Sequence, residues 1–368
     1  MRWNWQQRDW PAFSYDAEAL RAQEARFLKG AGVMVGAMSH LDEVDRQQLT
    51  ISIMAKEAVD SSAIEGEVLD RASVQSSVAR HLGIKADARR ASAAEAGAAE
   101  LMADLYRSYA EPLSDDTLCR WHAMLMNGRR DLTEAGVYRT HADPMQIVSG
   151  ALHAPKVHFE APPSEVVPEE MAAFIRWFNE SGPMGSAPVS VLARAGIGHL
   201  WFESIHPFED GNGRLGRALA QKALAQSLDA PAITSLAEAI QSNRKAYYEH
   251  LHRASLSNSI DNWLTWFADV ALTAQKRSTE HVEFLIAKTR LLDRLQGMIN
   301  ARQEKALLRL FAEGPDGFKG GLSAANYRTI TEALSATATR DLTELVELGA
   351  LRKEGELRYT RYFLRIGS

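Results

Sequence analysis

The sequence predicts a mainly helical protein that ends in a smaller region of mixed helix and strand. Long stretches are rich in Ala, Leu, Glu, Arg and Gln, with apolar residues at helical spacing and few alternating β-branched residues. From about Arg290 the pattern changes to shorter helices followed by two short strands. At 368 residues, the chain is long enough for two or three compact units.

The first expected segment, residues 1–86, is a helical leader. Within it, Glu43–Ile64 places its apolar residues largely at helical spacing, which predicts a helix with one buried face. The opening residues, MRWNWQQRDWPAF, carry charge and tryptophan where a signal peptide needs an unbroken apolar stretch. No run of about 18 apolar residues follows elsewhere, so we expect a cytoplasmic protein without a membrane segment.

The second expected segment, residues 87–285, is a helical core. Ala93–Tyr109 and Ser114–Asn127 have clear helical periodicity, and Ser114 is the expected N-cap of the latter. Proline and glycine cluster at Gly150–Pro163 and Ser181–Pro188, which indicates loops between the helices.

The third expected segment, residues 290–368, combines helices with a ribbon. Helices are expected at Gln303–Ala312, Ala324–Leu334 and Thr337–Leu348. The following stretch, GALRKEGELRYTRYFLRI, predicts a two-stranded ribbon that turns at Glu354–Glu356. Three helices and a ribbon in this order are typical of a winged helix, a variant of the helix-turn-helix plan.

Composition and charge exclude several classes of protein. Hydrophobic residues make up 46% of the chain and charged residues 24%, as in ordinary globular proteins. The net charge of -5 and the pI near 6.2 argue against a protein that coats nucleic acid or anionic membrane with its whole surface. The single cysteine, Cys119, excludes an internal disulfide and a cysteine-rich zinc site.

One segment concentrates residues that a hydrophobic core rarely uses. HPFEDGNGRLGR, at His206–Arg217, holds a histidine, two acids, three glycines and two arginines. The apolar stretch before it reads as a buried helix that ends near His206, because Pro207 disfavours helix in the residue before it. Arg214–Ser227 reads as the next helix, so the segment is a junction of helix, tight loop and helix.

The junction has the features of a phosphate site. Gly211, Asn212 and Gly213 come immediately before the second helix, so several backbone N–H groups can point at one anion. Arg214 and Arg217 are three residues apart and share one helix face. Because guanidinium groups bind phosphate oxygens in pairs, the two arginines favour a polyphosphate over a lone phosphate.

Two further residues of the junction suggest a reaction. Asp210 can hold a hydrated Mg²⁺ against the phosphates, and Glu209 is the less favoured ligand. His206 can accept a proton from a hydroxyl that attacks phosphorus. Each of these residues also has an ordinary structural role, but their conjunction in one stretch points to phosphoryl or nucleotidyl transfer.

The segment resembles the Fic domain signature, His-Pro-Phe-x-(Asp or Glu)-Gly-Asn-Gly-Arg-x-x-Arg, at every fixed position. The resemblance implies a mainly helical Fic fold that transfers AMP from ATP, with Mg²⁺, to Ser, Thr or Tyr hydroxyls of target proteins or of the chain itself. It implies that His206 is the general base and Asp210 the Mg²⁺ ligand. The nucleotide-binding residues that it implies here are Gly211, Asn212, Gly213, Arg214, Leu215, Gly216 and Arg217.

Two flanking regions extend the resemblance. Gly136–Met171 resembles the family's flap, a hairpin over the nucleotide that can add a target segment to its edge. The flap residues expected nearest the nucleotide are Val157, His158, Phe159 and Glu160. Asn243–Leu251 resembles the helix beside the adenine, which makes Tyr248, and after it Tyr247, a stacking partner for the base. A pair of tyrosines on a helix is equally typical of core packing.

SSAIEG, at Ser61–Gly66, resembles the family's inhibitory pattern, (Ser or Thr)-x-x-x-Glu-(Gly or Asn). Ser61, Glu65 and Gly66 match it. In this interpretation the Glu65 carboxylate pairs with Arg217, so ATP binds with its α-phosphorus poorly exposed to attack. The alternative is an ordinary capping interaction at a helix end.

The resemblance covers essentially the whole chain at family level. The stretch WNWQQRDWPAFSYD looks like the leader of long bacterial Fic proteins that carry a C-terminal winged helix. Members of the family often dimerise, so a homodimer stays open. Within the enzymes, the alternatives are a variant that transfers another nucleotide or a different phosphate-linked group, or one that removes AMP.

A regulator that senses ATP and binds DNA through the winged helix is the alternative outside the enzymes. Its expected recognition helix, Thr337–Gly349, carries Asp341, Glu344 and Glu347 against one basic residue, Arg340. Such a helix suits phosphate-rich DNA poorly. Basic residues of the ribbon leave weak DNA binding open, and these are Arg352, Lys353, Arg358 and Arg361. A role in docking protein or supporting a dimer is favoured.

Overall fold

The computed structural model describes residues 2–87, 89–132, 135–151, 154–231, 234–314, 318 and 320–366. Contacts divide the chain into two compact units. Unit 1 comprises Met1–Val33 and Thr50–Ser278, and unit 2 comprises Met34–Leu49 and Thr279–Ser368. Within the described ranges, no helix combines the length and the apolar character needed to cross a membrane.

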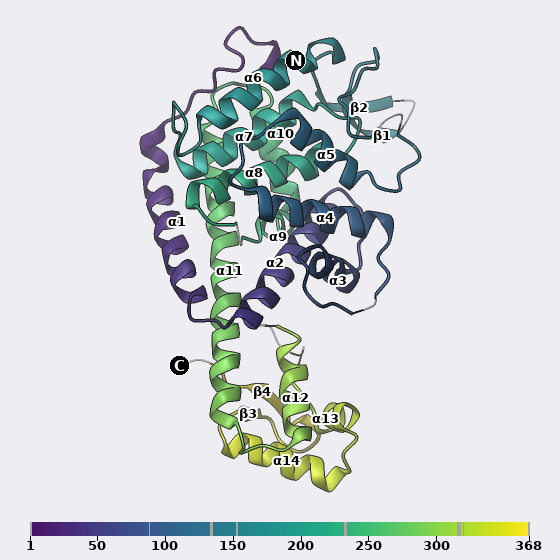
Figure 1. Ribbon diagram of the computed structural model, residues 1–368, viewed down its shortest axis with the longest axis vertical. Coiled ribbons are helices and arrows are strands. Elements are labelled where there is room, and N and C mark those ends of the chain that lie inside the picture. Colours follow the sequence, from purple (N-terminus) through teal and green to yellow (C-terminus); the bar gives the residue numbers. More distant parts are fainter. Residues whose placement is uncertain are drawn as a thin grey trace. The chain divides into compact units, whose positions relative to one another are not determined.

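Helices dominate the chain up to residue 295 (Figure 1). They are α1 (Ala17–Met38), α2 (Glu43–Ile64), α3 (Arg71–His81), α4 (Ala93–Ser108), α5 (Asp115–Leu125), α6 (Val167–Glu180), α7 (Val191–Ile205), α8 (Asn212–Leu228), α9 (Leu236–Gln241), α10 (Arg244–Ala254) and α11 (Asp261–Leu295). One antiparallel hairpin interrupts them, formed by β1 (Gln146–Ala151) and β2 (Ala154–Glu160). The mainly helical fold that the sequence predicts is confirmed.

Helices α7 and α8 lie side by side within unit 1 (Figure 1). Every residue of α7 is buried, which explains why apolar residues lie on all of its sides. Gly196 permits close packing against α11, because a Cβ there would lie 2.7 Å from Leu264 Cδ2. Large buried residues around this pair include Trp121, Phe174, Phe178, Phe202, Phe208, Trp263 and Phe267. The two helices are therefore anchored in the core of unit 1.

Local sequence signals set several helix ends. Ser114 accepts a hydrogen bond from the backbone N–H of Thr117, so it is the N-cap of α5 as predicted. At the start of α4, the Ser92 hydroxyl accepts from the Glu95 N–H while the Glu95 carboxylate accepts from the Ser92 N–H. These pairs satisfy N–H groups that have no partner inside the helix.

The N-terminal tryptophans support the hairpin and the helix beside it. Trp3 packs edge-on against Phe159 of β2, with ring centroids 5.3 Å apart. The Trp5 indole N–H donates to the Glu160 carbonyl at 2.7 Å, at the end of the same strand. The Trp10 indole donates to Glu170 on α6 at 2.9 Å. The aromatic leader thus fixes the end of β2 within unit 1.

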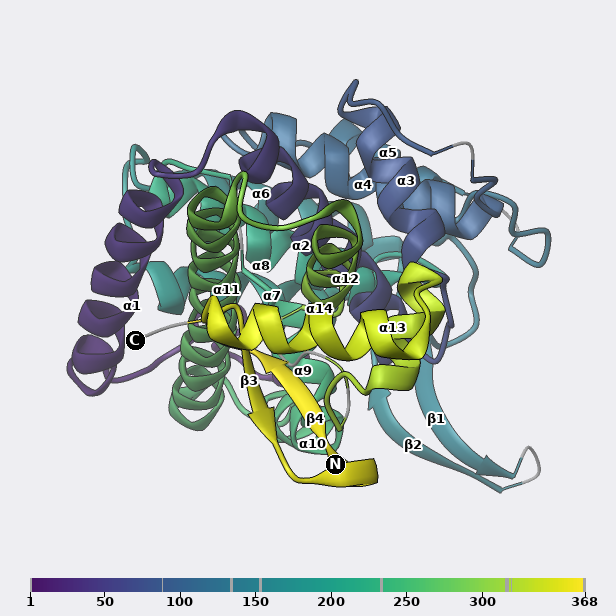
Figure 2. The ribbon, with the colours of Figure 1, turned by 90° about the horizontal axis from the view of Figure 1, so that it is seen from below.

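Unit 2 contains the C-terminal helices and a second ribbon (Figure 2). Its elements are α12 (Ala301–Phe311), α13 (Ala324–Thr331), α14 (Ser335–Glu347), β3 (Leu351–Glu354) and β4 (Arg361–Leu364). The strands pair antiparallel, with Leu351 opposite Leu364. The core of this unit includes Leu295, Leu307, Leu310, Tyr327, Leu342, Leu345 and Leu351.

Two details of unit 2 differ from the sequence interpretation. The ribbon does not turn within three residues, because Gly355 adopts a φ of 72° and a short 3-10 helix, Leu357–Tyr359, precedes β4. Asp341 does not face solvent, because it is buried and accepts hydrogen bonds from Tyr327 and Arg302, each at 3.0 Å. The exposed face of α14 therefore carries one acid fewer than the sequence suggested.

Candidate active site

His206 lies directly at the C-terminal end of α7. Its backbone is left-handed, with a φ of 50°, and its N–H donates to the Phe202 carbonyl at 3.0 Å. A non-glycine residue in this conformation is uncommon and is sustained by its surroundings. The chain therefore leaves the helix at His206, and the following residues lead into α8.

Arg139 fixes this helix end from a distant part of the chain. Its side chain is buried, and its Nε donates to the His206 carbonyl at 2.8 Å. Its Nη2 donates to the Pro162 carbonyl at 2.6 Å. Burial lowers the pKa of Arg139 to about 10, which still leaves the guanidinium charged near neutral pH. A cation at the C-terminal end of a helix is favourable because carbonyl groups without helical partners gather there.

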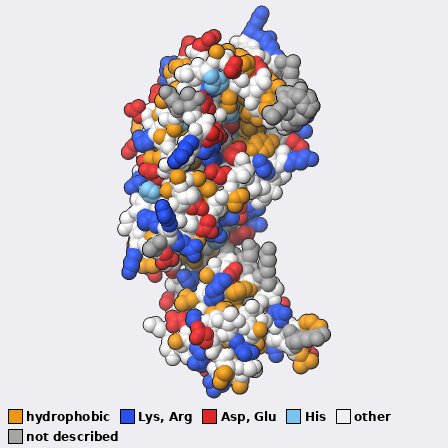
Figure 3. Space-filling model, turned by 90° about the vertical axis from the view of Figure 1, so that its right-hand side faces the viewer, with side chains coloured by type: hydrophobic (Ala, Val, Ile, Leu, Met, Phe, Trp, Pro, Cys, Tyr) orange, Lys and Arg blue, Asp and Glu red, His pale blue; other side chains and the backbone are white. Residues whose placement is uncertain are grey.

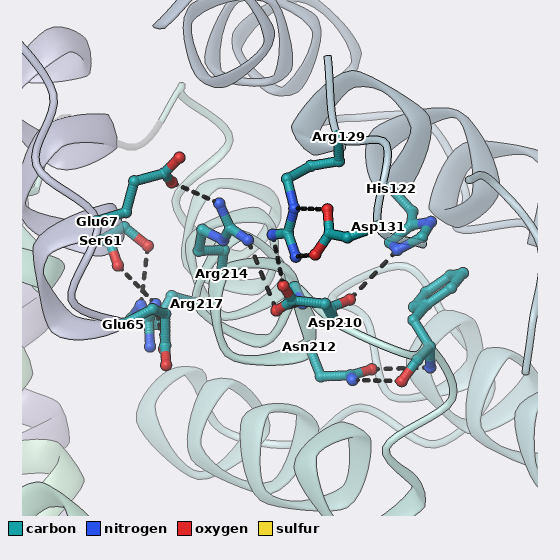
Figure 4. A network of polar contacts seen from close by, with 12 residues as sticks. Ser61, Glu65, Glu67, His122, Arg129, Asp131, Asp210, Asn212, Arg214 and Arg217 are labelled. Carbon is teal, nitrogen blue, oxygen red and sulfur yellow. Dashed lines mark hydrogen bonds and ion pairs between the residues drawn. The ribbon is translucent and has the colours of Figure 1, made fainter. Parts of the chain in front are cut away.

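Asn212 and His122 shape the loop between α7 and α8 (Figure 4). The Asn212 side chain accepts from the Phe208 N–H at 3.0 Å and donates to the Phe208 carbonyl at 2.8 Å. His122 Nδ1 accepts from the Gly136 N–H, so its proton lies on Nε2, which donates to the Asp210 carbonyl at 3.2 Å. The two side chains therefore fix the backbone of the loop at Phe208 and at Asp210.

Asp210 carries a negative charge that is already paired. Arg129 Nη1 donates to Asp210 Oδ2 at 2.7 Å, while the remaining guanidinium nitrogens of Arg129 bind both oxygens of Asp131 (Figure 4). The Asp210 carboxylate also accepts from the Gly211 N–H. These bonds lower the pKa of Asp210, against the effect of its partial burial, so the carboxylate is ionised at neutral pH.

The two arginines of α8 also have acidic partners. Arg217 Nη2 lies 2.8 Å from Glu65 Oε1, and its Nε donates to the Ser61 hydroxyl at 2.9 Å. Arg214 Nη1 lies 2.7 Å from Oε2 of Glu67 (Figure 4). The side chains of Arg217 and Arg214 are only 1% and 8% exposed, so both ion pairs are largely shielded from water.

Small residues of α8 leave room for these acids. Gly211 has a φ of 80° where the loop enters the helix, a conformation that favours glycine. A Cβ on Gly213 would lie 2.2 Å from Glu65 Oε1, and one on Gly216 would lie 2.6 Å from Glu203 Oε1. Leu215, between them, is fully buried in the core. Both glycines are therefore required by close approach of a carboxyl group.

His206 and Glu203 are neutral neighbours at physiological pH. Burial, followed by the positive charge of Arg139, lowers the pKa of His206 to about 4. Burial, followed by the negative charge of Glu65, raises the pKa of Glu203 to about 8. His206 Nδ1 lies 4.0 Å from Glu203 Oε2. An unprotonated imidazole is the form that can accept a proton.

A cavity of about 310 Å³ opens in unit 1 beside α7. Its size lies at the lower end of the range for small-molecule sites. Its lining is Ile147, His158, Phe159, Leu200, Glu203, Ser204, Tyr248, Leu251, His252 and Ser255. Of the sequence-predicted residues, His158, Phe159 and Tyr248 thus lie on one cavity. The Tyr248 hydroxyl also donates to the Ile64 carbonyl at 3.2 Å, at the end of α2.

Three other predicted residues lie apart from this cavity lining. Tyr247 is only 1% exposed and its hydroxyl is 2.9 Å from His199 Nε2, so its ring packs in the core. The Glu160 carboxylate accepts from the Gln146 side chain across the hairpin. Val157 is exposed on β2. The flap segment is therefore divided between the cavity wall and the outer surface of the hairpin.

Sequence reasoning missed four residues that shape the site. His122, Arg129 and Arg139 lie about 70 to 90 positions before the segment that they support, and nothing in their local spacing marks them. Glu67 lies one residue beyond the inhibitory pattern, which ends at Gly66. The sequence offered one signal for Glu67, because it is a second acid only two residues after Glu65.

The candidate site lies in a part of the chain that matches a known protein family. Residues 112–224 match the model of the Fic/DOC family, so the chain contains a Fic domain. Residues 3–84 match a model described as a domain of unknown function, DUF4172. The matched range includes the whole of His206–Arg217 as well as Arg129.

Named relatives and solved structures resemble parts of the chain. A protein adenylyltransferase fic-1 from Caenorhabditis briggsae is 31% identical over 146 residues, or 40% of this chain and 25% of the relative. A probable protein adenylyltransferase from Aquifex aeolicus is 36% identical over 69 residues, or 19% of this chain and 20% of that relative. The matched part of the chain thus spans a quarter or less of these relatives.

Two solved structures resemble the fold. A Fic family protein from Desulfovibrio desulfuricans has a TM-score of 0.52 and 20% identity, covering 93% of this chain and 95% of that one. A Fic domain containing signaling protein from Bacteroides thetaiotaomicron has a TM-score of 0.53 and 18% identity, covering 70% of this chain and 96% of that one. Both likenesses concern the fold alone.

Proposed function

We propose that this protein transfers AMP from ATP to Ser, Thr or Tyr hydroxyls of target proteins and of itself. The observation that carries the proposal is the convergence of an unprotonated His206, an ionised Asp210 and the two arginines of α8 on one loop and helix start. The names of the adenylyltransferase relatives support the same reaction class. The cavity beside α7, with Tyr248 on its wall, offers a place for the base.

In the proposed reaction, the oxygen of a target hydroxyl forms a bond to the α-phosphorus of ATP. The bond from that phosphorus to the bridging oxygen breaks, and pyrophosphate leaves. His206 takes the hydroxyl proton as the new bond forms. Asn212 and Gly213 direct backbone N–H groups of the helix start toward phosphate oxygens, with Gly211 as the turn before them, while Arg214 and Arg217 bind the outer phosphates.

The residues present fit a magnesium ion. Asp210 supplies an ionised carboxylate whose side chain is 41% exposed, and Mg²⁺ is often bound through one or two carboxylates and substrate oxygens. A bound Mg²⁺ would neutralise phosphate charge during transfer. Arg129 binds the same carboxylate, so Arg129 would have to release Asp210 when the ion binds. The Arg129 guanidinium would remain hydrogen-bonded to Asp131.

We further propose that Glu65 restrains transfer. Its ion pair with Arg217 occupies the group that would bind the γ-phosphate, and the Ser61 hydroxyl and carbonyl oxygens accept hydrogen bonds from the same guanidinium. A triphosphate therefore has to compete with a carboxylate of the chain. Such a coupling amounts to about 1 to 3 kcal/mol, or roughly 5- to 150-fold in affinity.

The test uses the wild type, Glu65→Gly and His206→Ala, each incubated with ATP and Mg²⁺ and weighed by intact mass spectrometry. We expect a covalent AMP adduct to increase in Glu65→Gly, because Arg217 becomes free for the γ-phosphate. His206→Ala should gain no adduct, because no group takes the hydroxyl proton. An absence of adduct in every variant would contradict AMP transfer, and equal labelling of wild type and Glu65→Gly would contradict the restraint.

For the remaining organisation we propose a leader at 1–86, a catalytic core at 87–285 and a winged helix at 290–368. The order of α12, α13, α14 and the β3–β4 ribbon supports the last of these. On the face drawn in Figure 3, acidic and basic side chains are interspersed rather than gathered by sign. Because DNA binding depends on clustered positive charge, a face with this pattern suits a protein partner better than DNA.

A further inference from the structure

The C-terminal end of α2 carries two glutamates, one on each side of Gly66. The Gly66 N–H donates to the Ala63 carbonyl at 3.1 Å, and the Glu67 N–H donates to the Ser62 carbonyl at 3.0 Å. Together with the φ of 87° at Gly66, these bonds form a Schellman motif. The motif ends the helix and fixes Glu65 and Glu67 in one rigid turn.

Both glutamates reach the arginines of α8 from this turn (Figure 4). Glu65 pairs with Arg217 at 2.8 Å, and Glu67 pairs with Arg214 at 2.7 Å. The two acids are 31% and 34% exposed, whereas their arginine partners are almost fully buried. The acids can therefore swing into water at modest cost. Arg217 left behind requires a new anion, because an unpaired buried charge is costly, whereas Arg214 keeps a longer contact with Asp210, whose Oδ1 lies 3.7 Å from its Nη2.

We propose that Glu67 is a second inhibitory carboxylate, which occupies Arg214 as Glu65 occupies Arg217. The inference rests on the proposed function, in which both arginines bind phosphates of ATP. In this arrangement the turn at Ser61–Glu67 is an internal anion with two carboxylates, and it competes with the nucleotide at two positions rather than one.

The shared turn makes the two contacts interdependent. Because the Schellman bonds hold Glu65 and Glu67 in one backbone conformation, a ligand that displaces the turn from Arg217 also draws Glu67 away from Arg214. Loss of either carboxylate therefore lowers the cost of displacing the other. Removal of Glu67 should strengthen ATP binding even while Glu65 is present.

The experiment measures binding and transfer separately on the full chain. Wild type, Glu67→Gln, Glu65→Gln and the double variant are titrated with ATP and Mg²⁺ in a calorimeter, and the AMP adduct is then weighed by mass spectrometry. Glu18→Gln is the matched control, because Glu18 forms a surface pair with Arg21 on α1. Glu67→Gln should bind ATP about 5-fold or more tightly than wild type, and Glu18→Gln should not differ.

A second arm separates an inhibitory contact from a merely structural one. In an Arg214→Gln background, Glu67→Gln should no longer change ATP affinity, because the proposed effect acts only through Arg214. A change that persists in this background would overturn the proposal, as would an ATP affinity of Glu67→Gln equal to that of wild type.

The outcomes also separate the proposed role of Glu67 from the proposed AMP transfer on which it rests. If Glu67→Gln strengthens ATP binding but no variant forms an adduct, the role of Glu67 at the arginines stands and AMP transfer fails. If Glu65→Gln gains adduct while Glu67→Gln changes neither binding nor transfer, AMP transfer stands and the second carboxylate is refuted. If no variant binds ATP, both are refuted.

Discussion

At the scale of single residues, His206 should remain an active base to an unusually low pH. Its pKa is lowered to about 4 by burial and by Arg139, so the imidazole stays unprotonated where an exposed histidine would already be charged. Initial rates of AMP adduct formation by Glu65→Gly should therefore be nearly constant from about pH 8 to about pH 6. A rate that falls with a midpoint near pH 6.5, the ordinary pKa of histidine, would contradict the lowered pKa of His206.

Residues of the site differ in how far the sequence could predict them. His206, Asp210, Arg214 and Arg217 were accessible because they share one short segment with a recognisable order. Arg129 was not, because its contact with Asp210 joins positions 81 residues apart and follows only from the packing of the helices. Ion pairs between distant parts of a chain leave no local spacing to detect.

At the scale of elements, Gly66 controls the end of α2. Its φ of 87° lies in the left-handed region, and a Cβ there would meet nothing within 4 Å. Gly66→Ala should therefore cost about 1 to 2 kcal/mol through backbone conformation rather than through a clash. We also expect tighter ATP binding, because strain in the turn weakens the contacts of Glu65 and Glu67 with α8.

Urea unfolding and calorimetric titration with ATP measure these two effects. The control is Gly32→Ala on α1, where a Cβ also meets open space but the backbone has no positive φ. Since alanine is the better helix former, Gly32→Ala should be neutral or stabilising, with unchanged ATP affinity. The role of the turn would be refuted if Gly66→Ala lost stability without any change in ATP binding.

Helices were easier to predict from the sequence than the turns between them. The helix at Glu43–Ile64 has the bounds that its periodicity predicted. By contrast, α8 begins at Asn212 rather than Arg214, because the Asn212 side chain bonds the backbone of Phe208 and orders the first turn. The ribbon of unit 2 contains a 3-10 helix that the pattern of strand residues did not indicate. Such turns depend on individual side-chain contacts rather than on periodicity.

At the scale of the whole molecule, the leader shows what a composition argument misses. The tryptophans near the start of the sequence were evident, but their composition did not reveal where the indoles lie. In the structure, Trp3 and Trp5 hold β2, whose Phe159 lines the cavity beside α7. A segment at the beginning of the chain thus stabilises one wall of the candidate site more than 150 residues later.

Stability of unit 1 should also depend on pH through a buried acid. The pKa of Glu203 is raised to about 8 from an ordinary value of 4.5, chiefly by burial. Between these values the folded protein keeps a proton that the unfolded chain releases, so the free energy of unfolding falls as pH rises. The slope from one such group is at most about 1.4 kcal/mol per pH unit. Glu57, whose pKa is raised from 4.5 to about 7, adds to this fall in unfolding free energy over the narrower range between those two pH values.

Glu203→Gln removes this titration while keeping a polar side chain of similar size. Urea unfolding followed by tryptophan fluorescence measures the effect in unit 1, because all 8 tryptophans of the sequence lie within its ranges. The difference in unfolding free energy between variant and wild type should grow in favour of the variant from about pH 5 to about pH 8. Glu18→Gln, at an exposed side chain on α1, is the matched control. A constant difference for Glu203→Gln would mean that Glu203 is ionised in the fold, and the neutral pair with His206 would have to be abandoned.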